Sequence, residues 1–242
     1  MRYDYLLFDA DNTLFDFDRA EERALQATLE FFGYPLDSDT RELYRTINRV
    51  LWRRLDLGEI SREALVVERF ALFDRAMGGG RDAAALNRFY LDRLSEGAEL
   101  LPGAEALCRS LAPRATLALV TNGVARAQRG RFQRSPLAGL VSHLFISEEL
   151  GAAKPDPAFF TAVLRALGDP PRSRVLVVGD NPATDVRGAL ASGLPAVWYD
   201  PRRLSDTGPW VPIWRVERFE QLKALILDRP LPPKLRPANR NT

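Results

Sequence analysis

The sequence is poor in several residue types on which protein sites often depend. Its 242 residues include a single histidine, a single cysteine and three lysines. One histidine makes a histidine-rich metal site or a Ser-His-Asp triad a poor candidate. Because Cys108 has no second cysteine to pair with, an internal disulfide is excluded, and a reducing cytoplasm is the expected location. The scarcity of lysine makes Lys154, in mid-chain, a residue of interest.

Long hydrophobic runs are also missing. No apolar run approaches the length that spans a bilayer, and the first run ends at once in acidic residues, unlike a signal peptide. We therefore expect no membrane partner. The formal charge is +2, but the four basic residues of 229–242 account for it, and the rest of the chain carries −2. We predict that 229–242 is a disordered basic tail, which removes most of the support for a nucleic-acid partner.

Two kinds of segment alternate along the chain. Runs that are apolar throughout, as expected for strands buried on both faces of a parallel sheet, occupy 5–9, 115–122, 143–147, 174–180 and 194–200. Helical patterns that separate the later runs occupy roughly 104–112, 124–134, 157–167 and 184–192. This alternation predicts an α/β fold with a doubly wound parallel sheet and a Rossmann-like core.

The segment 15–99 shows no strand pattern. About four helical stretches fill it, and most end in glycine. Because the first strand precedes them, these helices form an insertion after that strand rather than a separate N-terminal domain. The predicted domains are the α/β core, the helical insertion and the tail, at 1–14 with 100–228, 15–99 and 229–242. Within the second helix we expect an inward face made of Leu43, Ile47, Val50 and Leu51.

Polar residues follow the predicted strands at their carboxyl ends, where an open parallel sheet binds its ligands. They are Asp9 and Asp11 after the first strand, Thr121 and Asn122 after the second, Lys154 after the third, and Asp180 and Asp185 after the fourth. Four converging carboxylates need a cation, and Mg²⁺ suits oxygen ligands and a substrate phosphate, with Mn²⁺ as the alternative. Lysine and threonine suit phosphoryl oxygens. One aspartate can attack phosphorus while another handles the proton of the leaving oxygen.

The stretch "DADNT" allows several interpretations. In extended backbone Asp9 and Asp11 would point to one face, whereas an Asx-turn would end the strand instead. An EF-hand loop is excluded because Leu14 and Ala20 stand where glycine and glutamate are needed. No phosphate-binding G-x-x-x-x-G-K-[ST] loop is present. The motifs D-x-D-x-T, T-N-G, K-P-D-P and G-D-N-P-x-T-D, in this order, are specific only in combination.

In this order the motifs resemble those of the haloacid dehalogenase-like phosphatase superfamily, over nearly the whole chain to about residue 228. "DADNT", "VTNG", "KPDPAFF" and "VGDNPATD" are similar to its four motifs, and the helical insertion resembles its helical cap. The resemblance implies that Asp9 is the nucleophile and a metal ligand. It implies that Asp11 is the general acid and base, with its backbone carbonyl on the metal.

The resemblance extends to the remaining site residues. It implies that Thr121 and Lys154 bind phosphoryl oxygens with Asn122 beside them, that Asp180 is a metal ligand, and that Asp185 supports the metal or Lys154. An acid at position 11 argues against carbon–halogen cleavage. A phosphomutase and a catalytically inactive binding module stay open as alternatives.

A closer resemblance concerns the leaving group. "FDADNTLFDFDRAE", "INRVLWRRLDLGEIS" and "LFISEELGAAKPDPAFF" are similar to segments of bacterial pyrimidine 5′-nucleotidases that hydrolyse UMP, dUMP and dTMP, although sugar-phosphate and phosphoglycolate phosphatases share several of them. Tyr44, Asn48 and Trp52 recur every four residues on one helix face, so Asn48 and Trp52 are candidates to read a base. The alternative is that this stripe packs inside the cap. The expected partner is a small phosphomonoester, and a monomer and a homodimer are both left open.

Overall fold

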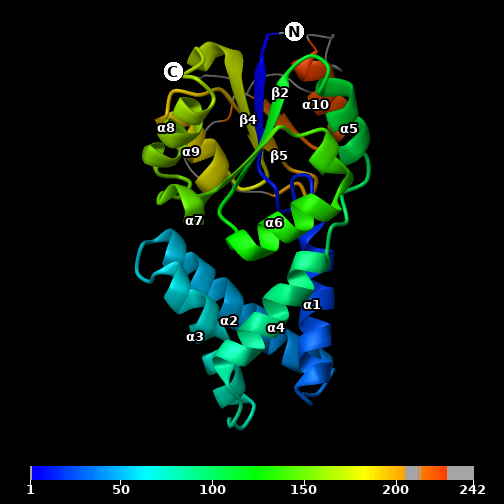
Figure 1. Ribbon diagram of the computed structural model, residues 1–242, viewed down its shortest axis with the longest axis vertical. Helices are drawn as coiled ribbons and strands as arrows, with labels where there is room; N and C mark the ends of the chain where they lie inside the picture. The colour runs from blue at the N-terminus through cyan, green and yellow to red at the C-terminus, as the bar shows by residue number, and fades with distance from the viewer. Residues whose placement is uncertain (1, 205–211, 213, 228–242) are drawn as a thin grey trace. The chain divides into compact units, whose positions relative to one another are not determined.

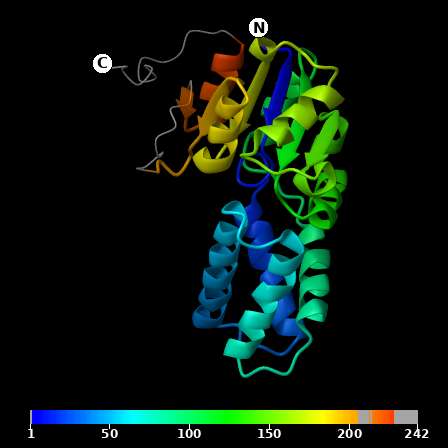
Figure 2. The same cartoon turned by 90° about the vertical axis from the view of Figure 1, so that its left-hand side faces the viewer.

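The computed structural model describes residues 2–204, 212 and 214–227, so the predicted tail 229–242 lies outside the described residues. Two compact units divide the chain (Figures 1 and 2). The α/β unit contains the described residues up to Phe17 and from Ala98 onward, and the helical unit is Asp18–Gly97. The sequence-based prediction puts these boundaries at residues 15 and 99.

The α/β unit is built on a parallel sheet, as predicted. Within the described residues its strands are β1 (Tyr5–Phe8), β2 (Thr116–Thr121), β3 (His143–Ile146), β4 (Val175–Gly179), β5 (Ala196–Tyr199) and β6 (Trp214–Val216). Their order is β3-β2-β1-β4-β5-β6. Five of these strands lie in the predicted apolar runs. The sixth was not predicted because β6 has only three residues, with Arg215 in the middle and one residue buried.

Both faces of the sheet are buried, because alternate strand residues enter two separate cores. Leu6 and Phe8 of β1 lie in one core, and Leu7 between them lies in the other. Helices α5 (Ala104–Leu111) and α10 (Phe219–Ile226) contribute to the first core, and α8 (Pro157–Ala166) contributes to the second. This arrangement explains why the strands are apolar at every position.

The remaining helices of the α/β unit follow the strands as expected for a doubly wound fold. They are α6 (Ala125–Arg134), α7 (Ser147–Leu150) and α9 (Arg187–Ala191). The helix predicted at 184–192 begins instead with a π-helical turn at Pro182–Val186, before α9. Asp156 caps α8 by accepting a hydrogen bond from the backbone N–H of Ala158 at 2.8 Å.

The strand order determines where the sheet can bind a ligand. β1 pairs with β2 on one side and with β4 on the other, so the chain order reverses between β1 and β4. In doubly wound sheets the crevice at the carboxyl ends of the strands on either side of such a reversal is the usual ligand site. Asp9 follows β1 directly, and Asp180 follows β4 directly.

The helical unit consists of α2 (Ser38–Asp56), α3 (Arg62–Ala76), α4 (Ala83–Glu96) and nearly all of α1 (Phe17–Phe31). Asp37, Ser61 and Asp82 cap α2, α3 and α4 by accepting hydrogen bonds from backbone N–H groups of the first turns. None of the helices in the described part of the chain has the length and apolar composition of a membrane span.

The inward face of α2 differs from the prediction. Val50 is 54 % exposed, so its assignment to the inner face is wrong. Leu51 is buried as predicted, Leu43 and Ile47 are half-buried, and Tyr44 and Asn48 are the further buried residues of this face. The Tyr44 ring lies 5.3 Å from the Phe70 ring and 5.7 Å from the Tyr90 ring, between centroids. The large ring therefore determines which side of α2 turns inward, and the polar Asn48 follows it because it is one turn away.

Candidate active site

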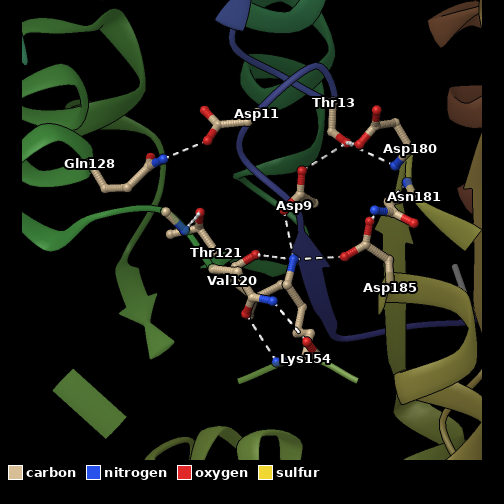
Figure 3. Close-up of polar contacts among 12 residues, drawn as sticks. Asp9, Asp11, Thr13, Val120, Thr121, Gln128, Lys154, Asp180, Asn181 and Asp185 are labelled. Atoms are coloured by element: carbon tan, nitrogen blue, oxygen red, sulfur yellow. Dashed lines mark hydrogen bonds and ion pairs between the residues drawn. The ribbon is translucent and has the colours of Figure 1, made fainter. Parts of the chain in front are cut away.

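A buried ammonium group joins two aspartates at the carboxyl ends of β1 and β4. The Lys154 Nζ atom lies 2.6 Å from Asp9 Oδ1 and 2.6 Å from Asp185 Oδ1 (Figure 3). All three side chains are almost fully buried. The scarce lysine identified in the sequence is thus the central cation of this cluster.

The backbone around Lys154 is held by the strand that ends at Thr121. Asn122 donates from Nδ2 to the Lys154 carbonyl at 2.7 Å and accepts from the Lys154 N–H at 3.0 Å. Lys154 Nζ also donates to the Val120 carbonyl at 2.8 Å. The amide of Asn122 thus bonds to the chain that carries the ammonium, and the ammonium has a fixed direction toward Asp9 and Asp185.

Thr13, which is not among the predicted site residues, belongs to the site. Its hydroxyl donates to Asp9 Oδ2 at 3.2 Å and accepts from the Asp180 N–H at 3.0 Å (Figure 3). The fifth position of "DADNT" therefore links the ends of β1 and β4. The D-x-D-x-T spacing was the available signal, because a tight turn brings residue 13 back beside residue 9.

Asp9, Asp180 and Asp185 form a group that could hold a metal ion. Each offers a carboxylate oxygen, and these oxygens lie within 4.8 Å of one another. The Asp185 carboxylate can lie against the end of β4 because Gly179 has no side chain. A β-carbon built on Gly179 would lie 2.1 Å from Asp185 Oδ2, so no other residue fits at position 179 without displacement. The same Oδ2 accepts a hydrogen bond from the Asn181 N–H at 3.1 Å.

The electrostatics of this group show an excess of negative charge. Burial raises the pKa of Asp9 to about 7, with Lys154 opposing the rise and Asp185 and Asp11 adding to it. Burial, Asp9 and Asp185 raise the pKa of Asp180 to about 8. Burial opposes the charge of Lys154, but Asp185 and Asp9 outweigh it and raise its pKa. One ammonium does not balance three carboxylates, and a divalent cation with oxygen ligands would.

Asp11 lies apart from this cluster. β1 ends at Phe8 and Asn12 has a φ of 57°, so the backbone is not extended through 9–12 and the two aspartates do not share one face. The Asp11 carboxylate instead accepts from Gln128 Nε2 at 2.6 Å (Figure 3). It also pairs with Arg131 Nη1. Neither α6 residue was singled out from the sequence. Their spacing of three on one helix, after the T-N-G motif, was the only available signal.

Thr121 lies at the end of β2 and is buried. Its hydroxyl accepts a hydrogen bond from the Gly123 N–H at 3.0 Å, which leaves the hydroxyl proton available to an acceptor. Among the predicted site residues, the α/β unit thus contains Asp9, Asp11, Thr121, Asn122, Lys154, Asp180 and Asp185.

The two predicted base-reading residues lie in the helical unit. Asn48 donates from Nδ2 to Glu21 Oε1 at 2.9 Å and accepts from Arg69 Nη1 at 3.4 Å. Arg69 also donates to Asn87 Oδ1 at 2.9 Å. Glu21, Asn48, Arg69 and Asn87, one from each helix, are called the cap cluster below. Trp52 is partly exposed and lies one turn beyond Asn48 on α2.

A sheet of this order, with aspartates gathered at its reversal point, is typical of α/β proteins that bind a ligand at the carboxyl ends of their strands. Within that class the chain belongs to the haloacid dehalogenase-like hydrolases, whose family model matches residues 3–193.

Curated relatives cover almost the whole chain. The pyrimidine 5′-nucleotidase PynA of Streptococcus pneumoniae is 33% identical over 92% of this chain and 94% of its own length. The pyrimidine 5′-nucleotidase YjjG of Escherichia coli is 30% identical over 93% of this chain and 99% of its own length. A ribulose-1,5-bisphosphate 5-phosphatase of Halopiger xanaduensis is 32% identical over 83% of this chain and 86% of its own length.

Solved structures agree with this assignment. The crystal structure of YfnB from Bacillus subtilis bound to magnesium has a TM-score of 0.88 and 33% identity, covering 94% of this chain and all of that one. An L-2-haloacid dehalogenase of Xanthobacter autotrophicus has a TM-score of 0.73 at 19% identity, over 93% of this chain and 98% of that one, which shows the common fold alone.

Proposed function

We propose that the protein is a metal-dependent phosphomonoester hydrolase that forms an aspartyl-phosphate on Asp9, with pyrimidine nucleoside 5′-monophosphates as substrates. The observation that carries the proposal is the buried Asp9–Lys154–Asp185 group beside Asp180, in which three carboxylates share one ammonium. Such a group suits a substrate that arrives with a divalent cation and presents anionic oxygens.

In this proposal Asp9 Oδ2 attacks phosphorus, since Oδ1 is bound to Lys154. The bond from phosphorus to the leaving oxygen breaks, and Asp11 gives that oxygen a proton. Water then attacks the phosphorylated Asp9 and Asp11 takes a proton from it, which releases phosphate and restores both acids. Thr121 supplies an O–H to the phosphoryl oxygens. Lys154 supplies an N–H by exchanging one of its three present acceptors, Asp9, Asp185 or the Val120 carbonyl, for a phosphoryl oxygen.

The residues that would hold Mg²⁺, or Mn²⁺ in its place, are Asp9 and Asp180 with Asp185 behind them, and the resemblance adds the Asp11 carbonyl. When bound, the ion would offset the carboxylate repulsion and attract the negative charge of the phosphoryl group. The magnesium-bound structure of YfnB, which is similar over almost the whole chain, supports this assignment.

The choice of leaving group rests on the helical unit and on the relatives. Two nucleotidases that act on pyrimidine nucleotides cover nearly the whole chain. A partly exposed Trp52 can stack on a pyrimidine ring, and such stacking contributes roughly 1–3 kcal/mol in nucleic-acid sites. Asn48 has one amide proton and one lone pair beyond those bound to Glu21 and Arg69, which could pair with a uracil or thymine edge.

A sugar-phosphate or phosphoglycolate phosphatase is the second candidate. The observation that favours it is the engagement of Asn48 inside the cap cluster, which leaves this amide less free to read a base. The similarity to the ribulose-1,5-bisphosphate 5-phosphatase supports the same alternative.

A phosphate-release assay tests both candidates. We would measure kcat/KM for UMP, dUMP, dTMP, AMP, GMP, glucose 6-phosphate and phosphoglycolate with Mg²⁺. A uracil or thymine nucleotide is expected to be the best substrate, and purine nucleotides are expected to be poor if the pocket fits one ring. If a sugar phosphate or phosphoglycolate exceeded every nucleotide tenfold, the nucleotidase proposal would fail while the phosphatase chemistry stood.

A variant of the helical unit sharpens the test. Trp52→Ala should raise KM for UMP about tenfold, through lost stacking, and leave KM for glucose 6-phosphate unchanged. Val50→Ala, on the same helix and exposed, is the matched control. Equal losses on UMP and on glucose 6-phosphate would assign Trp52 to packing.

A further inference from the structure

Two neighbouring aspartates in the α/β unit are bound by two different cations. Lys154 binds Asp9, and Arg131 binds Asp11. The Asp11 charge is close enough to contribute to the raised pKa of Asp9, so the two carboxylates repel each other. In the proposed function these two side chains have different tasks, and the separate cations keep them at separate positions.

The pair that holds Asp11 comes from one face of α6. Gln128 and Arg131 are three residues apart on this helix, so their side chains lie side by side. Gln128 Nε2 binds Asp11 Oδ2 at 2.6 Å, and Arg131 Nη1 binds Asp11 Oδ1. Each carboxylate oxygen therefore has its own donor, one neutral and one charged. Gln128 and Arg131 together are called the Asp11 clamp below.

The clamp is built into the fold. The Arg131 side chain is only 1 % exposed, and its guanidinium lies over the rings of Phe15 and Phe17, 4.9 and 5.5 Å from their centroids. The side chain of Gln128 occupies the space beside Gly123, where a β-carbon would lie 2.1 Å from Gln128 Nε2. The glycine of the T-N-G motif therefore admits Gln128 to its place.

We propose that Arg131 and Gln128 are the positioning residues of the general acid and base, holding Asp11 on the leaving-group side of the phosphoryl site and away from Lys154. This inference rests on the proposed function. It adds two residues of α6 to the proposed catalytic arrangement and gives each of them a separable task.

The geometry of phosphoryl transfer makes such a hold necessary. The attacking and leaving oxygens lie on opposite sides of phosphorus. An acid that protonates the leaving oxygen must therefore stand away from Asp9, as Asp11 does (Figure 3). Without the clamp, the Asp11 carboxylate would be drawn to the Lys154 ammonium and would compete with Asp9 for it. A displacement of about 1 Å at a catalytic group can cost 10²-fold in rate.

The two residues of the Asp11 clamp differ in charge, so they hold the two carboxylate oxygens of Asp11 differently. The charged Arg131 retains Oδ1, so we assign Oδ2, held by the neutral Gln128 amide, as the oxygen that carries the proton. That proton passes from Oδ2 to the leaving oxygen as the phosphorus–oxygen bond breaks. Oδ2 later takes a proton from the water that attacks the phosphorylated Asp9, so the proton balance of the cycle closes.

The dependence of rate on the leaving group tests this role. We would measure kcat/KM, which reports the step up to leaving-group departure, for dTMP and for p-nitrophenyl phosphate in the full-length protein with Mg²⁺. The nitrophenolate leaves without a proton, whereas the nucleoside alkoxide needs one. Gln128→Leu and Arg131→Met should lower kcat/KM about 10- to 100-fold for dTMP and less than threefold for p-nitrophenyl phosphate.

Gly123→Ala provides a variant that leaves both clamp residues in place chemically and displaces Gln128 only sterically. It should show the same selective loss as Gln128→Leu, even if Arg131→Met fails to fold. Arg129→Gln is the matched control, because Arg129 lies on the same helix, carries the same charge and pairs with Glu149 at the surface. This control should keep wild-type values with both substrates.

Equal losses for both substrates in Gln128→Leu and Gly123→Ala, or no loss in either, would overturn the positioning role. Failure of the proposed function gives a different result, because Asp11→Asn would then show no preference between the two leaving groups. A selective loss in Asp11→Asn without one in Gln128→Leu or Gly123→Ala would reject the clamp alone.

Discussion

Both units of the protein bury charged side chains, but they balance the charges differently. In the α/β unit three carboxylates, Asp9, Asp180 and Asp185, share one ammonium. In the helical unit the cap cluster contains one carboxylate, one guanidinium and two amides. Burial raises the pKa of Asp9 and of Asp180, and it also raises that of Glu21, but only Glu21 has a full opposing charge of its own in Arg69.

The difference in charge balance indicates that the cluster of the α/β unit binds a ligand and that the cap cluster stabilises the helical unit. A buried group with excess negative charge is stabilised by a cation, so we expect the α/β unit to bind one. A balanced cluster needs nothing more, and because its members come from four different helices it joins those helices to one another. We infer that loss of charges from the first group will affect activity, and that loss from the second will affect stability.

The largest effect is expected for Asp9→Asn. An amide cannot attack phosphorus, so turnover of every phosphomonoester should be lost while the melting temperature is kept or rises, because one of three repelling charges is removed. Phosphate release and thermal unfolding measure the two quantities. Asp4→Asn, which removes a surface carboxylate paired with Arg174, is the control. Wild-type turnover in Asp9→Asn would disprove the proposed nucleophile.

Removal of the metal is expected to abolish activity, as Asp9→Asn does. Dialysis against EDTA should abolish activity, and Mg²⁺ should restore it. Mg²⁺ at a hundred times its dissociation constant should also add about 2.7 kcal/mol to the stability of the wild type and much less to that of Asp180→Asn. Full activity after exhaustive chelation would exclude a metal at this site.

Arg69→Met should show the reverse pattern in the helical unit. It removes the largest opposing charge of the Glu21 carboxylate and leaves two amide oxygens without their donor, at a cost of about 3 kcal/mol. The melting temperature should fall, and the rise produced by Mg²⁺ should persist. Arg75→Met, on the same helix and exposed, should change stability by less than about 0.5 kcal/mol. A lost response to Mg²⁺ in Arg69→Met would contradict the separation of roles.

The smallest effect is expected for Glu21→Gln. Burial raises the pKa of Glu21 above its ordinary value of 4.5, so between 4.5 and the raised pKa the folded protein holds a proton that the unfolded chain has lost. The Glu21 contribution to stability therefore decreases as pH rises through this window. Glutamine removes this dependence, so the variant should gain stability relative to the wild type as pH increases from 4.

The difference in melting temperature between Glu21→Gln and the wild type, measured against pH, checks this prediction. The total change should stay within about 1 kcal/mol, because glutamine can still accept the hydrogen bond from Asn48. Glu30→Gln, exposed on the same helix, should show no such trend. A variant that lost stability as pH rose would show that Glu21 is stabilised as the charged form.

Part of this protein could be predicted from the sequence alone. Apolar runs without alternation identify strands buried on both faces, because a parallel sheet is covered by helices on each side. The acidic and hydroxyl residues at the ends of these runs identify the place of the site, because parallel strands bring their carboxyl ends to one edge. Lys154 was recognisable because lysine is rare in this chain.

Only the tertiary structure decided which partner each polar side chain has. Periodicity cannot show that the turn after β1 separates Asp9 from Asp11, because the positive φ of Asn12 depends on the contacts around it. Nor can it show that Asn48 is used inside the cap cluster, or that Gln128 and Arg131 reach a residue more than a hundred positions away. Hydrogen-bond partners are chosen by distance in space, and the sequence determines local pattern but not which distant groups the fold brings within 3 Å.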